Sequence, residues 1–301
     1  MTTVPVIDAH QHIWDLSRAD YPWLGEDRAP INRTVPFEEV QPQLAAAGVP
    51  ATVLVQAADN AEDTALMLEC AELHREVVAV VAYAPLDRPE ALGERLAGFA
   101  ADPVVVGVRT LIHDQPDPDW LLRTEVQEGL GLLERSGLSF DVVAVLPRHL
   151  EIVLLLSERF PELRMVIDHL GEPPFGAPRA HPWWSLLAVA AENPRVTAKV
   201  SGLYPRARGV AATEAIQPHF EHALEHFGPD RLMYGSDWPI SVLAGGYAAT
   251  FATLEPLFTA LPAAERSAVL GGTAARFYGI DPDRLAAASA SRPDSGALGR
   301  G

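Results

Sequence analysis

Val6-Ile7-Asp8-Ala9-His10-Gln11-His12-Ile13-Trp14-Asp15 begins as an apolar, β-type run and then places two histidines two residues apart. In a β-strand, residues i and i+2 point to the same face, so we expect Asp8, His10 and His12 to project together. Two imidazoles on one wall can bind a divalent metal or polarise a carbonyl oxygen. The alternative is that one histidine packs in a core and the other caps a loop.

Outward from this stretch, short apolar runs alternate with longer amphipathic segments along the chain. The strand-like runs are Val4–Ile13, Thr52–Ala57, Val77–Tyr83, Val104–Thr110, Leu138–Val143, Arg164–Asp168, Val196–Gly202 and Arg231–Gly235. The helical patterns cover Phe37–Ala47, Ala61–Arg75, Pro89–Ala101, Asp119–Ser136, Arg148–Arg159, Trp183–Asn193, Thr213–Phe227, Tyr247–Leu261 and a closing Ala263–Tyr278. Strands and helices that alternate in this way over 301 residues are typical of a parallel (β/α)8 TIM barrel, an α/β fold.

A doubly wound open sheet is the alternative arrangement of the same elements. A glycine-rich phosphate-binding loop after the first strand would favour it, and this chain has His10-Gln11-His12 there instead. We therefore predict a single barrel domain over residues 1–285. The tail of residues 286–301 is small and polar, and we expect it to be disordered.

Composition narrows the class of partner. The net charge of −17 opposes binding to nucleic acid or to an anionic membrane surface. No apolar run approaches the roughly 18 residues that span a bilayer, and Met1-Thr2-Thr3 leaves no room for a signal peptide before the first strand. Cys70 is the only cysteine, which excludes a disulfide framework and a thiolate zinc site. We expect a cytoplasmic protein with a small-molecule substrate; a homo-oligomer is compatible with the sequence.

Polar side chains follow the predicted strands at the end where barrel enzymes carry their catalytic groups. His10 and His12 end the first strand, His169 ends the sixth, and Asp237 ends the eighth. Three histidines and a carboxylate can form a mononuclear metal site with positions left for water and a substrate oxygen. Asp237 can serve as a ligand, as a general base toward water, or as both; its alternative role is to cap the next helix. A core or capping role is equally compatible with His169 taken alone.

Three further polar residues are candidates for substrate binding. Arg109 ends the fourth strand, and its planar guanidinium group can bind a carboxylate through two N–H groups. Its alternative role is a structural salt bridge. Lys199 is the only lysine; it can bond a substrate oxygen or neutralise a buried carboxylate such as Asp8. His113 can reach the pocket or stay exposed on its loop.

Trp14 and Trp238 lie on loops at strand ends, where indole rings can stack on the C–H faces of a sugar. Burial in a lid is the competing interpretation. The loops Gly171–Pro182 and Tyr204–Thr213 are where we expect specificity for ring hydroxyls to lie.

Several motifs, in this order over about residues 4–280, resemble the amidohydrolase-2 family of metal-dependent hydrolases. They are Asp8-Ala9-His10-Gln11-His12-Ile13-Trp14-Asp15, Tyr21-Pro22-Trp23-Leu24, Gly107-Val108-Arg109, Asp168-His169-Leu170-Gly171, Lys199-Val200-Ser201-Gly202-Leu203 and Tyr234-Gly235-Ser236-Asp237-Trp238-Pro239. Within the family they are most similar to sugar-acid lactonases, such as fuconolactonases and rhamnonolactonases, and to the related 2-pyrone-4,6-dicarboxylate lactonase.

The resemblance implies a (β/α)8 hydrolase whose core residues are His10, His12, His169 and Asp237. It implies one divalent metal, zinc or manganese, or catalysis without a metal. In the broader superfamily a carboxylated lysine on a middle strand bridges two metals. Here the middle strands carry no lysine and the fifth offers Asp141, so we expect one metal at most.

The function inferred from these residues is the opening of a small lactone, a sugar-acid lactone above all. Asp237 would activate water, and the three histidines would polarise the carbonyl directly or through the metal. One alternative is a metal-dependent decarboxylase of an aromatic or dienoic acid, which the tryptophan-rich loops oppose. Another alternative is a barrel that binds a small molecule without catalysis. For such a protein we would expect at least one of the four core residues to be missing.

Overall fold

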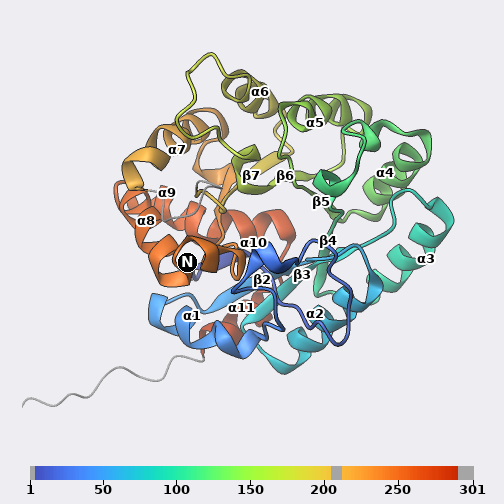
Figure 1. The fold of residues 1–301 in the computed structure, drawn as a ribbon, viewed down its shortest axis with the longest axis horizontal. Helices are drawn as coiled ribbons and strands as arrows, with labels where there is room; N and C mark the ends of the chain where they lie inside the picture. The colour runs from blue at the N-terminus through green and yellow to red at the C-terminus, as the bar shows by residue number, and fades with distance from the viewer. Residues whose placement is uncertain (1–3, 205–211, 291–301) are drawn as a thin grey trace, which may run out of the picture.

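Eight parallel strands form one sheet at the centre of the molecule (Figure 1). The computed structural model describes residues 4–204 and 212–290. The strands are β1 (Ile7–Gln11), β2 (Ala51–Val55), β3 (Val77–Tyr83), β4 (Val105–Arg109), β5 (Ser139–Val142), β6 (Met165–Ile167), β7 (Val196–Val200) and β8 (Leu232–Tyr234). Each strand pairs with its neighbour in sequence and helices surround the sheet, so the predicted (β/α)8 TIM barrel is confirmed.

The strands are buried because helices cover one face of the sheet and the barrel interior covers the other. Val77–Tyr83 is a continuous apolar run up to its final tyrosine, and β3 has the predicted bounds. The other predicted strands are also present, with ends that differ by a few residues.

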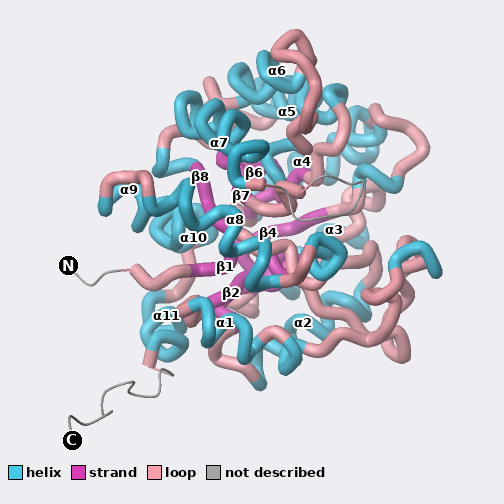
Figure 2. Tube along the Cα trace, turned by 60° about the vertical axis from the view of Figure 1, so that its left-hand side comes forward, coloured by secondary structure: helices cyan, strands magenta, loops and turns pink. Residues whose placement is uncertain are grey.

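Helices follow the strands and enclose them (Figure 2). They are α1 (Gln41–Ala47), α2 (Ala61–Leu73), α3 (Pro89–Phe99), α4 (Thr124–Ser136), α5 (Pro147–Arg159), α6 (Trp183–Ala190), α7 (Thr213–Phe227) and α8 (Tyr247–Thr259). Local signals account for several ends. The Asn60 side chain accepts the Asp63 N–H at the start of α2, and Gly48 and Gly137 end α1 and α4 in the left-handed conformation.

The predicted helix Ala263–Tyr278 is interrupted. It consists of α9 (Ala263–Ser267), a π-helical turn at Ala268–Gly272, and α10 (Thr273–Tyr278). A Cβ added to Gly271 would lie 2.0 Å from the Pro5 carbonyl oxygen, so the turn packs directly on the chain before β1.

One further helix, α11 (Pro282–Ser289), was not predicted. The Asp281 side chain caps it, and Leu285 and Ala288 are buried as the helix packs on β2 and β3 (Figure 2). The predicted start of the tail at residue 286 is therefore wrong, because this apolar face orders the chain through Ser289. Residues 291–301 lie outside the described residues.

The barrel closes between β1 and β8 through residues of the predicted site. The Asp237 N–H donates to the His10 carbonyl at 2.8 Å, and the His12 N–H donates to the Trp238 carbonyl at 2.7 Å. Outside this seam, α1 and α8 lie side by side (Figure 1). Closure of the barrel therefore places Asp237 beside the two histidines of β1.

Apolar side chains pack in two clusters. The larger cluster lies between the strands and the surrounding helices. The smaller one joins Val53, Val81, Val166 and Met233 of the strands to Leu285 of α11. Within the described residues, no helix is long and apolar enough to cross a membrane.

Candidate active site

Three histidines and one aspartate converge at the C-terminal mouth of the barrel. The Asp237 Oδ1 lies 3.6 Å from His10 Nε2, 3.4 Å from His12 Nε2 and 3.9 Å from His169 Nε2. The Nε2 atoms of His10 and His12 are 3.1 Å apart. The structure thus brings together the four core residues that the sequence singled out from β1, β6 and β8.

Two of these four residues have left-handed backbone. His169 and Asp237 both have a φ of +55°, which costs a non-glycine residue on the order of 1 kcal/mol. The seam hydrogen bond holds Asp237, and Ser201 Oγ lies 2.9 Å from His169 Nδ1. A Cβ added to Gly202 would come within 2.5 Å of the same Nδ1, so this glycine makes room for the ring. The conformation of both residues is thus imposed by their surroundings.

The second ring nitrogens of the β1 histidines have different environments. His12 Nδ1 donates to the Val55 carbonyl at 2.7 Å, which leaves its Nε2 as an acceptor at the mouth. His10 Nδ1 lies 3.0 Å from Lys199 Nζ and 3.3 Å from Asp168 Oδ1. The two rings therefore have different partners although they meet at Nε2.

Burial and neighbouring charges set the protonation of the site. Burial lowers the pKa of His12, and burial together with Lys199 holds the pKa of His10 well below its usual value. Burial raises the pKa of Asp237, but His169 and the contact with His12 outweigh it and hold that pKa below its usual value. An ionised carboxylate therefore faces two neutral imidazoles near pH 7, an arrangement suited to general-base chemistry.

A network of buried charges lies beneath these residues. Lys199 Nζ is 2.6 Å from Asp141 Oδ2 and 3.1 Å from Asp168 Oδ1, and Arg109 Nη1 is 3.1 Å from Asp168 Oδ2. Two cations balance two carboxylates, as buried charges require. The carboxylates that Lys199 neutralises are Asp141 and Asp168, so the prediction of Asp8 in that role was wrong.

Asp8 does not join the histidines either. The pairing register of β1 shifts between Asp8 and Gln11, and this irregularity breaks the strict alternation assumed from the sequence. The Asp8 carboxylate accepts the N–H of His10 at 3.2 Å and that of Ser236 at 2.8 Å, beside Tyr247 of α8. Its place is in the seam between β1 and β8, where burial raises its pKa to about 7.

Arg109 and His113 border the site in different ways. Arg109 donates hydrogen bonds to Asp168 and to the Gln56 carbonyl, which is the structural role named as its alternative in the sequence analysis. Its Nη1 also lies 3.4 Å from His10 Nε2. His113 lies in a short 3-10 helix after β4, with its Nε2 3.7 Å from Asp114 Oδ1. Contact of either residue with a substrate stays a prediction.

The two candidate tryptophans pack inside the loops. Trp14 is fully buried; its Nε1 donates to the Arg33 carbonyl at 2.6 Å and its ring meets Trp23 edge-on at 5.3 Å. Trp238 is buried at the barrel seam. The packing interpretation therefore describes both indoles better than sugar stacking does.

Tyr204 is a site residue that the sequence reasoning missed. Its hydroxyl donates to Asp237 Oδ2, the carboxylate oxygen that the histidines leave unused. Its position directly after Lys199-Val200-Ser201-Gly202-Leu203, at the end of β7, was the available signal. Residues 205–211, most of the loop expected to set specificity, lie outside the described residues.

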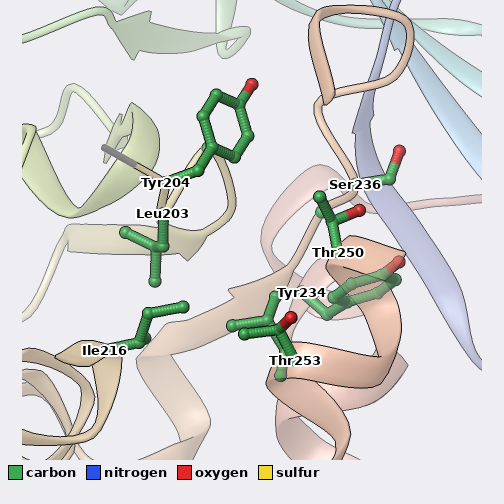
Figure 3. Close-up of a pocket in the computed structure, with 10 residues that line it drawn as sticks. Leu203, Tyr204, Ile216, Tyr234, Ser236, Thr250 and Thr253 are labelled. Carbon is green, nitrogen blue, oxygen red and sulfur yellow. The ribbon is translucent and has the colours of Figure 1, made fainter. Parts of the chain in front are cut away.

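A narrow cavity beside Tyr204 is too small for a substrate. Leu203, Ile216, Tyr234 and Thr253 line it between α7, α8 and the strand ends (Figure 3). It has about 10 Å³ for the centre of a water molecule, which is room for roughly one water. In Figure 3 the Tyr204 ring points away from these apolar side chains.

Three of the four core residues, His10, His169 and Asp237, are spaced so that they could share a single divalent metal. A tetrahedral ion with bonds of 2.0–2.2 Å separates its ligand atoms by about 3.4 Å. Asp237 Oδ1 lies 3.6 Å from His10 Nε2 and 3.9 Å from His169 Nε2. His10, His169 and Asp237 offer ligand atoms that all lie within 4.8 Å of one another. His12 also has the usual second contact of a metal ligand, a ring N–H donated to a carbonyl.

Fold and site together define a hydrolase barrel of the amidohydrolase type. A family model described as Amidohydrolase matches residues 7–280, and the chain belongs to this family.

The chain is 35% identical to an L-fucono-1,5-lactonase of Burkholderia ambifaria over 279 residues, which cover 91% of this chain and 96% of that protein. Two crystal structures of an amidohydrolase from Burkholderia multivorans are also similar. One, with HEPES bound, has a TM-score of 0.85 at 33% identity; the other, with zinc bound, has a TM-score of 0.83 at 32% identity. Each comparison covers 92% of this chain and 100% of the other.

Proposed function

We propose that the protein hydrolyses the ring ester of a sugar-acid lactone. The observation that carries this proposal is the ionised Asp237 carboxylate, 3.4–3.6 Å from the Nε2 atoms of two buried, neutral histidines at the barrel mouth. The similarity to an L-fucono-1,5-lactonase supports the substrate class and makes that lactone the first compound to test.

Ring opening requires an activated water, a polarised carbonyl and a proton for the departing ring oxygen. In the proposed reaction Asp237 Oδ1 accepts a proton from water as its oxygen attacks the carbonyl carbon. The same carboxyl returns that proton to the ring oxygen when the C–O bond breaks. No other proton donor or acceptor is needed to balance the step.

The histidines divide the remaining tasks. His12 Nε2 is an acceptor, so it orients the attacking water together with Asp237 and does not itself donate to the carbonyl. This refines the prediction that all three histidines act alike. His10 and His169 present their Nε2 atoms toward the same space, where the carbonyl oxygen would lie.

A zinc or manganese ion held by His10, His169 and Asp237 would add Lewis-acid polarisation of the carbonyl. The hydrogen bond from the Tyr204 hydroxyl to Asp237 Oδ2 and the one from the Asp237 N–H to the His10 carbonyl orient the carboxylate whether or not an ion is bound.

The test is a proton-release assay of purified protein against L-fucono-1,5-lactone, epimeric aldono-1,5-lactones, aldono-1,4-lactones and 2-pyrone-4,6-dicarboxylate. Each lactone is compared with its spontaneous hydrolysis, and carbon dioxide release from aromatic carboxylic acids is measured in parallel. Saturable turnover of at least one aldonolactone is expected. Release of carbon dioxide with no lactone turnover would replace the proposal by the decarboxylase alternative.

A further inference from the structure

We infer that Lys199 is a positioning residue that holds the His10 imidazole in its Nε2–H form. In this form His10 is a hydrogen-bond donor at the barrel mouth and a poor ligand for a metal. Lys199 is the only lysine of the chain and is fully buried on β7 beneath the mouth.

The hydrogen bonds of the Lys199 ammonium group determine where His10 carries its proton. A lysine ammonium has three N–H donors and no acceptor. Lys199 Nζ has two hydrogen-bond partners, Asp141 Oδ2 at 2.6 Å and His10 Nδ1 at 3.0 Å. Asp168 Oδ1 lies 3.1 Å from Nζ as an ion pair without hydrogen-bond geometry. Because the ammonium group can only donate, His10 Nδ1 is the acceptor in its hydrogen bond with Lys199 and carries no proton of its own.

The two carboxylates have other donors as well. The Tyr278 hydroxyl donates to Asp141 Oδ2 at 2.8 Å, and Arg109 donates to Asp168 Oδ2 at 3.1 Å. Neither carboxylate therefore depends on a second N–H from Lys199. An N–H of Lys199 is available for His10.

The neighbouring His12 ring also favours a proton on His10 Nε2. His12 is fixed by Val55 with an acceptor at Nε2, 3.1 Å from His10 Nε2. A proton on His10 Nε2 makes this contact a donor–acceptor pair. Two unprotonated nitrogens at this distance would repel each other, so the contact with His12 favours the same tautomer as the contact with Lys199. Arg109 Nη1 also lies 3.4 Å from His10 Nε2, but it donates to Asp168 Oδ2 over the shorter distance of 3.1 Å.

Metal binding requires the opposite tautomer. A lone pair on His10 Nε2 would move the ring proton to Nδ1, where it would face an N–H of Lys199. Metal-binding histidines instead donate their second nitrogen to a carboxylate, a carbonyl or water. Asp168 Oδ1, 3.3 Å from Nδ1, accepts that proton only if Lys199 gives up its contact with His10. Lys199 therefore favours hydrogen-bond donation by His10 Nε2 and lowers the affinity of the site for a metal ion.

This inference rests on the proposed function only in its last step, in which a bound lactone carbonyl oxygen replaces His12 Nε2 as the acceptor of the His10 Nε2–H. The tautomer and the metal affinity can be measured without any substrate. A wild-type protein that opens no lactone would therefore overturn the proposed function and leave the assignment of Lys199 standing.

The decisive measurement is a long-range ¹H–¹⁵N correlation spectrum of chelator-treated protein labelled with ¹⁵N-histidine. The His10 signals are assigned by their loss in a His10→Asn variant. We expect a protonated Nε2 and an unprotonated Nδ1. A proton on Nδ1 of His10 in the wild-type protein would overturn the inference without recourse to any variant of Lys199.

A paired variant tests the cause. Lys199→Met combined with Asp141→Asn removes one positive and one negative charge, and Arg109 still pairs with Asp168. The ring proton of His10 should move to Nδ1, and zinc measured by calorimetric titration should bind at least about 10-fold more tightly. An unchanged tautomer or an unchanged zinc affinity would contradict the role of Lys199.

Tyr278→Phe is the matched control. It removes the other side-chain donor to Asp141 and leaves the contact between Lys199 and His10 in place. We expect its tautomer and its zinc affinity to match the wild type. An equal gain in zinc affinity in this variant would show that loosening of the buried network, rather than Lys199, controls the ion.

Discussion

Replacement of Gly202 by alanine should disable the site while the barrel stays folded. Gly202 follows β7 with a φ of +60°, and a Cβ built on it would lie 2.5 Å from His169 Nδ1 and 2.7 Å from His169 Cγ. Carbon atoms in contact without repulsion stay more than 3 Å apart, so the imidazole would have to retreat by about 0.5–0.9 Å. Its contact with Ser201 Oγ at 2.9 Å would break in the process.

The expected loss follows from that displacement. A shift of nearly 1 Å in a group that orients the substrate costs a factor on the order of 10² in rate. We therefore expect kcat/KM of Gly202→Ala to fall about 100-fold on the lactone that the wild type opens best. The left-handed backbone adds about 1–2 kcal/mol of strain to an alanine, which lowers the free energy of unfolding by a similar amount.

Gly137→Ala separates the clash from the strain. Gly137 ends α4 with a φ of +76°, and nothing lies within 4 Å of its added Cβ. Both variants should lose similar stability in urea titrations, and only Gly202→Ala should lose activity in the proton-release assay. Activity of Gly202→Ala within threefold of the wild type, or an equal loss in Gly137→Ala, would refute this reasoning.

Two further predictions concern other groups. Tyr204→Phe removes a charge-assisted hydrogen bond to Asp237 that is worth about 1.5–3 kcal/mol. The pKa of Asp237 should rise, the acid limb of the pH–rate profile should move to higher pH, and kcat/KM should fall about 10-fold; an acid limb that does not move would count against this role. Burial raises the pKa of Asp63 from its usual value near 4 to about 6, so the stabilising contribution of the protonated carboxyl is complete below pH 4 and is lost as pH rises through 6. The free energy of unfolding of the wild type relative to Asp63→Asn should fall by about 2–3 kcal/mol from pH 4 to pH 7 in urea titrations; a constant or rising difference would contradict the raised pKa.

The pattern of apolar residues was enough to predict the barrel. A run such as Val77–Tyr83 is long, β-branched and uninterrupted, so its burial between two layers is legible in the sequence. The meeting of His10, His169 and Asp237 was also predictable, because the ends of parallel barrel strands share one mouth.

Features that depend on a single irregularity or on distant pairing were not predictable in this way. Asp8 was misplaced because one register shift in β1 moves it to the seam. The partners of Lys199 come from β5 and from the end of β6, and no local pattern connects Asp141 to them. Tyr204 lies beyond a strand end without any periodic signal.

The C-terminal helix was missed for a different reason. Residues 282–289 are few and rich in alanine, and they lead directly into a tail of small, polar residues that resembles a solvated segment. Burial of Leu285 and Ala288 against β2 and β3 supplies the order that the local sequence does not show.

The most direct test of the account is the rate of lactone opening by Asp237→Asn beside the wild type, both chelator-treated and with their metal content measured. Asparagine is among the residues that tolerate the φ of +55° found at this position, so the seam and the fold should be retained. Loss of the general base predicts a fall in kcat of about 10²–10⁴, with an unchanged circular dichroism spectrum and melting temperature. A folded Asp237→Asn protein that keeps more than about a tenth of the wild-type rate would contradict the assignment of Asp237 as the base that activates water.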